Sequence, residues 1–148
     1  MNLPIAWAAL HRLLGSGPGL TPSGDDFATG FFLGMQSVSP GQGRQAFLGG
    51  LTQATLAQSC DSTDVSRACL EHAAAGRFSA PLTSLVEGIT SRANNLPARL
   101  ADVLVIGHSS GRDAAFGVLC GLAVTEAGLR TRVITKLSHA HLHEKTAR

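Results

Sequence analysis

Two stretches of this chain share one pattern of residues that are able to bind a ligand. Each begins with serine, glycine and aspartate and continues with two glycines at steps of four, in the form S-G-x-D-x3-G-x3-G. The first stretch is residues 23–34 and contains Asp26, and the second is residues 110–121 and contains Asp113. A serine is typical of a helix N-cap, and an aspartate in the first turn complements the helix dipole. Because a helix start presents unpaired N–H groups, two such starts predict a binding site for an anion.

A loop rich in glycine and hydroxyl residues precedes each stretch. The first loop covers residues 15–22 and the second covers residues 107–109. Backbone N–H groups and hydroxyls in such loops can surround a phosphate or a carboxylate. Asp25 has an arginine as its counterpart in the second copy, so a solvated acid of the first turn is an alternative for it. The candidate anion-binding residues are Gly17, Gly19, Thr21, Ser23, Gly24, Asp25, His108, Ser109, Ser110 and Gly111.

The spacing also predicts how the two aspartates meet. Residues four apart share one face of a helix, so each aspartate lies in line with the two glycines that follow it. If the helices pack in parallel along these glycines, Asp26 and Asp113 come together at one end and are the candidate catalytic residues. They could act as a general base, hold the N–H groups of a substrate amide, or share a magnesium ion with a phosphate. The alternative is that the glycines only permit close packing and the aspartates only complement the dipoles.

Two further groups of polar residues are candidates for binding. Thr63, Ser66 and Arg67 place hydroxyls and a guanidinium at a predicted helix start, where they could bind an anion or simply form a surface helix end. The histidines of residues 139–143 alternate as metal ligands on a strand do. Near a chain end, the alternative is an exposed tail with adventitious metal affinity. No cofactor is indicated with certainty, and magnesium is the one metal that the aspartates suggest.

Composition and charge exclude several classes of protein. The 148 residues are 44% hydrophobic and 15% charged, which indicates one globular domain long enough to bury a core. A net charge of +2 from scattered basic residues gives no reason to expect nucleic acid or an acidic membrane as a partner. Three cysteines without metal-ligand spacing, no basic leader and no apolar run of about 20 residues predict a cytoplasmic protein.

Helical periodicity dominates the chain. It predicts an all-α single domain over residues 1–148, a bundle of six or seven helices with a possible short strand near 132–135. Residues 103–106 could end a helix or form another short strand. A helix is expected from Gly111 to about Ala127, because its apolar residues form a strong stripe: Phe116, Leu119, Cys120, Ala123, Val124 and Ala127.

Residues 107–111 also match G-x-S-x-G, the nucleophile elbow of α/β-hydrolases. Those enzymes place an acid and then a histidine after the serine, and they build a parallel sheet. Here the acids between Ser109 and His139 lie on the helix that follows the serine, and no series of βα units is visible. A serine hydrolase that uses Ser109 is therefore an alternative without its usual context.

Residues 17–26, Gly-Pro-Gly-Leu-Thr-Pro-Ser-Gly-Asp-Asp, and residues 107–113, Gly-His-Ser-Ser-Gly-Arg-Asp, resemble a bacterial family that includes a subunit of oxamate carbamoyltransferase. The resemblance covers nearly the whole chain. It implies the conversion of oxalurate and phosphate into oxamate and carbamoyl phosphate by a complex of different subunits. Members of that family typically carry a further, β-rich N-terminal half, so this chain resembles only the C-terminal part of that longer architecture.

The resemblance and the doubled loops together predict a subunit of a carbamoyl-transferring enzyme that binds phosphate or a small carboxylate metabolite. Its expected partners are that metabolite and other protein subunits. A non-catalytic accessory subunit, in which the glycines are purely structural, is the first alternative. The serine hydrolase is the second.

Overall fold

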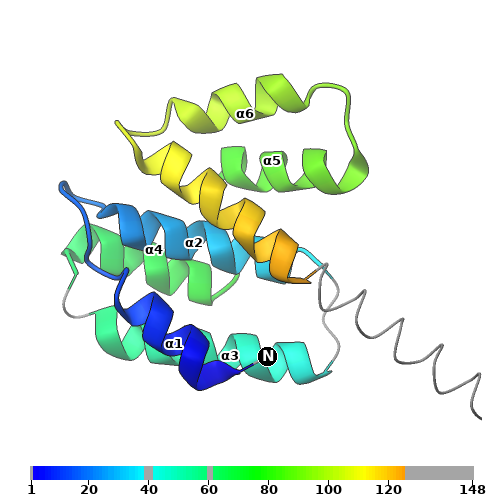
Figure 1. The fold of residues 1–148 in the computed structure, drawn as a ribbon. Helices are drawn as coiled ribbons and strands as arrows, with labels where there is room; N and C mark the ends of the chain where they lie inside the picture. Colours follow the sequence, from blue (N-terminus) through cyan, green and yellow to red (C-terminus); the bar gives the residue numbers. More distant parts are fainter. Residues whose placement is uncertain (1, 39–41, 60–61, 126–148) are drawn as a thin grey trace, which may run out of the picture.

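The chain is built from helices. A computed structural model describes residues 2–38, 42–59 and 62–125. The helices are α1 (Leu3–His11), α2 (Ser23–Gln36), α3 (Gln42–Gln58), α4 (Asp64–Ala74), α5 (Ala80–Ser91), α6 (Leu96–Leu104) and a seventh helix over residues 110–125 (Figure 1). No residue within these ranges belongs to a β-strand. The prediction of an all-α single-domain fold is confirmed, whereas the strand expected near 132–135 lies outside the described residues.

Two groups of buried side chains hold the helices together. Met35 and Leu51 belong to the group that joins α1, α2, α3 and α4. Leu85, Val103 and Val118 belong to the group that joins α2, α5, α6 and the 110–125 helix. Helix α2 contributes to both groups, so it lies at the centre of the domain.

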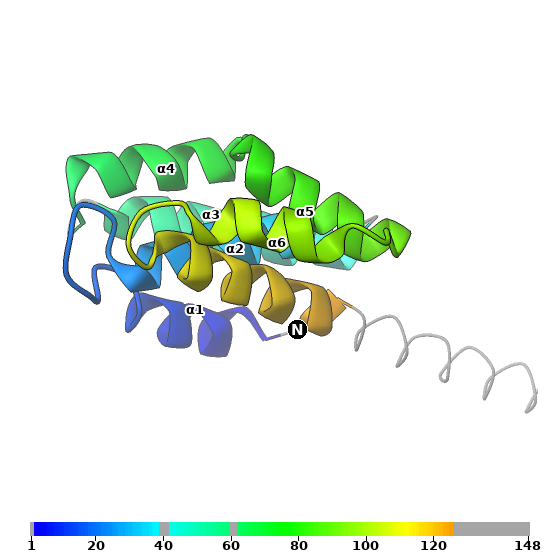
Figure 2. The ribbon, with the colours of Figure 1, turned by 90° about the horizontal axis from the view of Figure 1, so that it is seen from above.

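Helix α2 and the 110–125 helix pack against each other through their glycines. A Cβ atom on Gly30 would lie 1.9 Å from the carbonyl oxygen of Ala114, and one on Gly117 would lie 2.1 Å from that of Phe27. The contact is therefore backbone to backbone, closer than residues with side chains allow. Residue numbers rise together on both sides of this glycine seam, so the helices run in parallel, as predicted (Figures 1 and 2).

The repeat in the sequence is also a repeat in the structure. One turn further along, a Cβ on Gly34 would lie 2.4 Å from the carbonyl oxygen of Val118, and one on Gly121 would lie 2.4 Å from that of Phe31. Val118 and Phe31 occupy the same position in their copies of the pattern, as the two glycines do. Exchanging the copies leaves these contacts unchanged, so an approximate twofold axis runs along the seam.

The helix predicted from Gly111 is confirmed over residues 110–125, but within these residues its apolar stripe lies largely at the surface. Phe116 and Leu119 are 61% and 55% exposed, whereas Gly117 and Val118 are buried. Close backbone contact requires the smallest residues at the seam, so the large apolar residues are turned outward. Hydrophobic periodicity alone gives no weight to glycine as an inward-facing residue.

Neither helix is capped by its serine, in contrast to the prediction. Ser23 is the first residue of α2, and its N-cap is Pro22, which makes no side-chain hydrogen bond. Ser110 likewise lies inside its helix. Residues 103–106 do not form a strand, because α6 ends at Leu104 and a turn follows. None of the helices within the described residues has both the length and the apolar character to cross a bilayer.

Candidate functional site

The two glycine-rich loops lie at the same end of the molecule (Figures 1 and 2). The hydroxyls of Thr21 and Ser110 are hydrogen-bonded at 2.8 Å, although they are 89 residues apart in the sequence. Thr21 comes from the first loop and Ser110 from the start of the 110–125 helix. Parallel packing along the glycine seam brings these two segments together, and Asp26 lies beside both hydroxyls.

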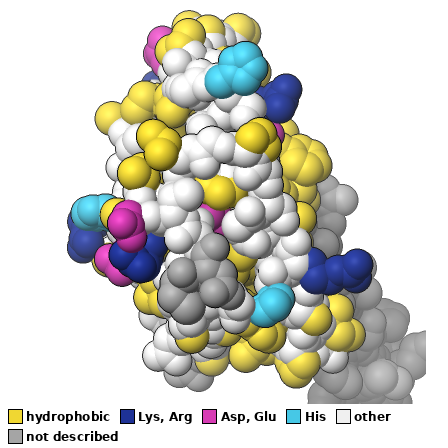
Figure 3. Space-filling model, turned by 90° about the vertical axis from the view of Figure 1, so that its left-hand side faces the viewer, with side chains coloured by type: hydrophobic (Ala, Val, Ile, Leu, Met, Phe, Trp, Pro, Cys, Tyr) yellow, Lys and Arg dark blue, Asp and Glu magenta, His cyan; other side chains and the backbone are white. Residues whose placement is uncertain are grey.

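A cavity of about 480 Å³ opens at this end of the seam. Figure 3 looks onto the face that carries the loops, and an acidic side chain is visible at the bottom of a hollow among uncharged atoms. The cavity is large enough for a small metabolite. Its lining comes from the first loop, α2, α4, the α4–α5 turn, the start of α5, the loop after α6 and the 110–125 helix: Thr21, Asp26, Thr29, Cys69, His72, Arg77, Phe78, Ser79, Leu82, Ile106, Gly107, Ser110, Gly111 and Ala114.

Asp26 is the carboxylate of this cavity. Burial raises its pKa, the hydroxyls of Ser110 and Thr21 oppose the shift, and the negative charges of Asp113 and Asp25 add to it. The charge of Asp113 thus acts on Asp26 across the end of the seam. Among the described groups, one buried carboxylate oxygen of each, Oδ2, has no hydrogen-bond donor.

Asp113 differs from Asp26 in its surroundings. Its side chain is 18% exposed, it does not line the cavity, and its Oδ1 lies 3.5 Å from Nε of Arg112. A carboxylate oxygen that lacks a donor can accept an N–H group of a ligand or bind a cation. The chemistry available at this point is therefore that of hydrogen-bond acceptors and of a carboxyl group able to hold a proton.

Asp25 points into a different part of the molecule. It is 1% exposed, and its carboxylate accepts hydrogen bonds from Gly15 N at 2.8 Å, from Ser66 Oγ at 2.6 Å and from the hydroxyl of Ser62. It is thus not a solvated acid of the first turn. These bonds tie the first loop to the start of α4, and they engage both carboxylate oxygens of Asp25.

Thr63, Ser66 and Arg67 form no part of the cavity lining. Thr63 is the N-cap of α4, because its hydroxyl accepts from Ser66 N at 3.1 Å and donates to the carbonyl of Leu20. Arg67 is ion-paired with Asp64 one turn away in the same helix, at 2.5 Å. The structure therefore gives these side chains partners within the protein.

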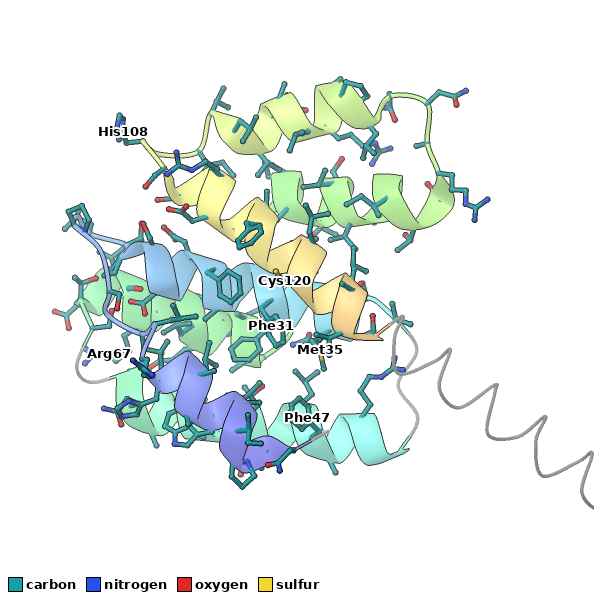
Figure 4. All side chains as sticks on the ribbon, in the orientation of Figure 1. Phe31, Met35, Phe47, Arg67, His108 and Cys120 are labelled. Carbon is teal, nitrogen blue, oxygen red and sulfur yellow. The ribbon has the colours of Figure 1, made fainter. Side chains whose placement is uncertain are left out.

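The remaining loop residues divide between close packing and exposure. Gly24 N–H donates to Ser16 O at 3.0 Å, and Gly111 N–H donates to Ile106 O at 3.0 Å, so neither amide is free for an anion. His108 is exposed at the outer tip of its loop (Figure 4). Four other candidates, Gly17, Gly19, Ser23 and Ser109, also lie outside the cavity lining.

Residues of the α4–α5 region complete the cavity, and no motif in the sequence pointed to them as site residues. Cys69 and His72 lie on α4, Arg77 precedes α5, and Ser79 is its N-cap. Burial raises the pKa of the Cys69 thiol, and the charge of Asp26 adds to that shift. Only Gly76, a helix-ending glycine, could have marked this segment as an ordered turn.

The described residues contain no cluster of three or more His, Cys, Asp or Glu side chains arranged to hold a metal ion. A pair of carboxylates such as Asp26 and Asp113 is smaller than such a cluster. The histidines of residues 139–143 lie outside the part of the chain that the structure describes.

The sequence pattern of one protein family, the oxamate carbamoyltransferase subunit AllH, matches residues 13–122. The chain belongs to this family. The match runs from the end of α1 through both copies of the repeat and every segment that lines the cavity. No solved structure gives a significant match to the chain.

Membership in the AllH family makes this chain a relative of an enzyme subunit, and a subunit implies other protein chains as partners. The hydrolase alternative loses its structural context, since α6 and a turn, not a strand, precede Ser109. His11 and His72 are the other histidines within the described ranges besides His108, and neither has a hydrogen bond to Ser109.

Proposed function

We propose that this chain is the metabolite-binding subunit of a carbamoyl-transferring enzyme and that its ligand occupies the cavity beside Asp26. The observation that carries the proposal is the meeting of both repeat copies there. Thr21 and Asp26 from the first copy and its loop lie against Ser110 from the second, within the residues that match the AllH family. The ligand class is a small carboxylate metabolite or phosphate.

Asp26 is suited to handle a proton in such a reaction. In carbamoyl transfer to phosphate, a phosphate oxygen bonds to the carbamoyl carbon, the bond from that carbon to the amide nitrogen breaks, and the nitrogen takes a proton. A carboxyl group whose pKa is raised by burial can supply that proton or hold the N–H groups of the substrate. Of the hydroxyls of Thr21 and Ser110, the one that accepts in their mutual hydrogen bond keeps its proton and would donate it to an oxygen atom on which negative charge develops.

Magnesium fits the same two carboxylates. The donor-free Oδ2 atoms of Asp26 and Asp113 are hard oxygen ligands, and Mg²⁺ commonly uses one or two carboxylates together with phosphate oxygens. In that arrangement the ion would neutralise phosphate charge, and the two aspartates would hold it.

A thermal-shift titration tests the proposal. Phosphate, carbamoyl phosphate, oxamate and oxalurate are added with and without magnesium to the wild-type chain and to Asp26→Asn. A ligand at about 100 times its Kd stabilises the fold by roughly 2.7 kcal/mol, which raises Tm visibly in a chain of this size. We expect a ligand-dependent rise in the wild type that is lost in Asp26→Asn.

Ser109→Ala is the matched control, because Ser109 lies outside the cavity and is the nucleophile only in the hydrolase alternative. This variant should keep the ligand-dependent rise. If none of the ligands raises Tm in the wild type, the accessory-subunit alternative with a purely structural glycine seam replaces the proposal.

A further inference from the structure

We propose that Arg77, held in place by His72, binds the anionic group of the ligand in the cavity. This inference rests on the proposed ligand site beside Asp26. It assigns the carboxylate or phosphate of the ligand to the wall built by the end of α4 and the start of α5, which lies outside both copies of the repeat.

The turn after α4 fixes the position of Arg77. Gly76 has a φ of 72°, in the left-handed region that favours glycine. Its N–H donates to Ala73 O at 3.0 Å, and the N–H of Arg77 donates to His72 O at 2.8 Å. These two bonds form a Schellman motif, which satisfies the last carbonyls of the helix and places Arg77 directly over its final turn.

The side chain of Arg77 is oriented as well. Its Nε donates a hydrogen bond to Nδ1 of His72 at 2.9 Å, so the imidazole presents its acceptor nitrogen to the guanidinium. The two Nη atoms have no hydrogen bond or ion pair with any described residue. Arg67 and Arg99, by contrast, lie within 4.0 Å of a carboxylate. Arg77 thus retains the two donors that suit a carboxylate or phosphate.

The surrounding lining supports an anion at this wall. Arg77 is the only lysine or arginine among the described residues that line the cavity. Ser79, the N-cap of α5, makes no capping hydrogen bond with its side chain, and it lines the cavity together with Leu82. The start of this 12-residue helix therefore adds free N–H groups, a hydroxyl and the positive end of a dipole beside Arg77.

The charges of the cavity favour a ligand with two chemically different ends. Asp26 repels an anion and accepts N–H groups, whereas Arg77 attracts an anion and offers only donors. A ligand with an amide nitrogen at one end and an anionic group at the other satisfies both. Arg77 is then a specificity-determining residue, and His72 is a positioning residue that acts through it.

Isothermal titration calorimetry of the full chain tests this assignment with three probes: oxamate, its neutral ethyl ester and inorganic phosphate. The proteins are the wild type, Arg77→Gln, Asp26→Asn and the control Arg67→Gln, whose arginine is paired with Asp64 outside the cavity. A charge-assisted hydrogen bond corresponds to roughly tenfold or more in Kd. We expect Arg77→Gln to weaken oxamate or phosphate at least tenfold and the ester less than twofold, whereas Arg67→Gln changes neither.

His72 is tested in the same way. His72→Leu should reproduce part of the loss of oxamate binding, and His72→Asn, which keeps an acceptor near the Nδ1 position, should restore it. A merely structural role would not distinguish the ester from the anion.

Three outcomes contradict the proposal in different ways. If Asp26→Asn weakens oxamate binding and Arg77→Gln does not, the ligand site stands and the anion assignment is wrong. Equal loss of ester and oxamate binding in Arg77→Gln also overturns the assignment. If the wild type binds none of the probes, the proposed function fails and the assignment fails with it.

Discussion

Asp25 and Asp26 are neighbours in the sequence, yet their carboxylates have opposite surroundings. Asp25 accepts three hydrogen bonds, whereas Asp26 keeps a buried oxygen without a donor among the described groups. A hydrogen-bonded buried carboxylate stabilises the fold, and an under-bonded one destabilises it when ionised. The first aspartate is therefore structural, and the second is available to a ligand.

We predict that Asp25→Asn destabilises the protein. The NH₂ group of asparagine cannot accept a hydrogen bond, so it would face donors among Gly15 N, Ser62 Oγ and Ser66 Oγ without bonding to them. The loss lowers the unfolding free energy by about 1–3 kcal/mol. Urea denaturation monitored by circular dichroism measures this. A variant as stable as the wild type would contradict the role given to the three bonds.

We predict that Asp26→Asn stabilises the protein at neutral pH. Because burial raises the pKa of Asp26 in the folded state above its usual 3.8, folding favours the protonated carboxyl. The stabilisation that the protonated carboxyl gives to the fold is complete below the pKa of Asp26 in the unfolded chain. It is lost as the pH rises through the pKa of Asp26 in the folded protein. The gain from Asp26→Asn should therefore increase between about pH 4 and pH 7.

The measurement is the unfolding free energy of both proteins across that pH range, with Asp64→Asn as the control. Asp64 is a first-turn acid on the surface of α4 and is 90% exposed. A gain for Asp26→Asn that stays constant with pH, or a loss that deepens toward neutral pH, would show that Asp26 is not held in a desolvated position.

At the scale of elements, the glycine seam sets the position of both loops. We predict that Gly30→Ala and Gly117→Ala each destabilise the fold by about 3 kcal/mol or more. Each added methyl group meets a backbone carbonyl that cannot move without separating the helices. The approximate twofold axis predicts similar losses at the two positions.

Gly49→Ala in α3 is the matched control for the seam. A Cβ atom there meets nothing within 4 Å, so alanine should raise the stability by about 0.5–1 kcal/mol through its higher helix propensity. Thermal unfolding of the three variants decides the point. Equal effects at Gly30 and Gly49 would exclude close packing at the seam.

The seam was predictable because it depends on spacing within each copy of the repeat. Asp26, Gly30 and Gly34 share one helix face whatever the rest of the chain does. The burial of Asp25 was not predictable, since its partners Ser62 and Ser66 lie 37 and 41 residues later in the sequence. The fold alone brings them together.

The cavity wall could not be predicted for the same reason, because its residues meet the loops only in the folded protein. His72 and Arg77 stand beside an ordinary helix-ending glycine, and only the packing of α4 on α2 and the placement of α5 carry them to the loops. The outward position of Phe116 and Leu119 has another cause, because backbone contact at the glycines leaves no room for large apolar residues at the seam.

At the scale of the whole molecule, the helical domain brings two distant loops and the α4–α5 turn around one cavity. Every segment that lines it lies within residues 13–122, the part that matches the AllH family. We propose that a small metabolite binds in this cavity, and Cys69 provides a reporter on its wall.

The most direct measurement is the rate at which iodoacetamide alkylates each cysteine, followed by mass spectrometry with and without saturating oxamate, phosphate or carbamoyl phosphate. Because the pKa of Cys69 is raised, the reaction is run at about pH 9, where more thiolate is present. We predict that at least one ligand slows the alkylation of Cys69 fivefold or more and leaves Cys120, which lies outside the cavity lining, unchanged. Alkylation of Cys69 at the same rate under saturating ligand would contradict binding in this cavity.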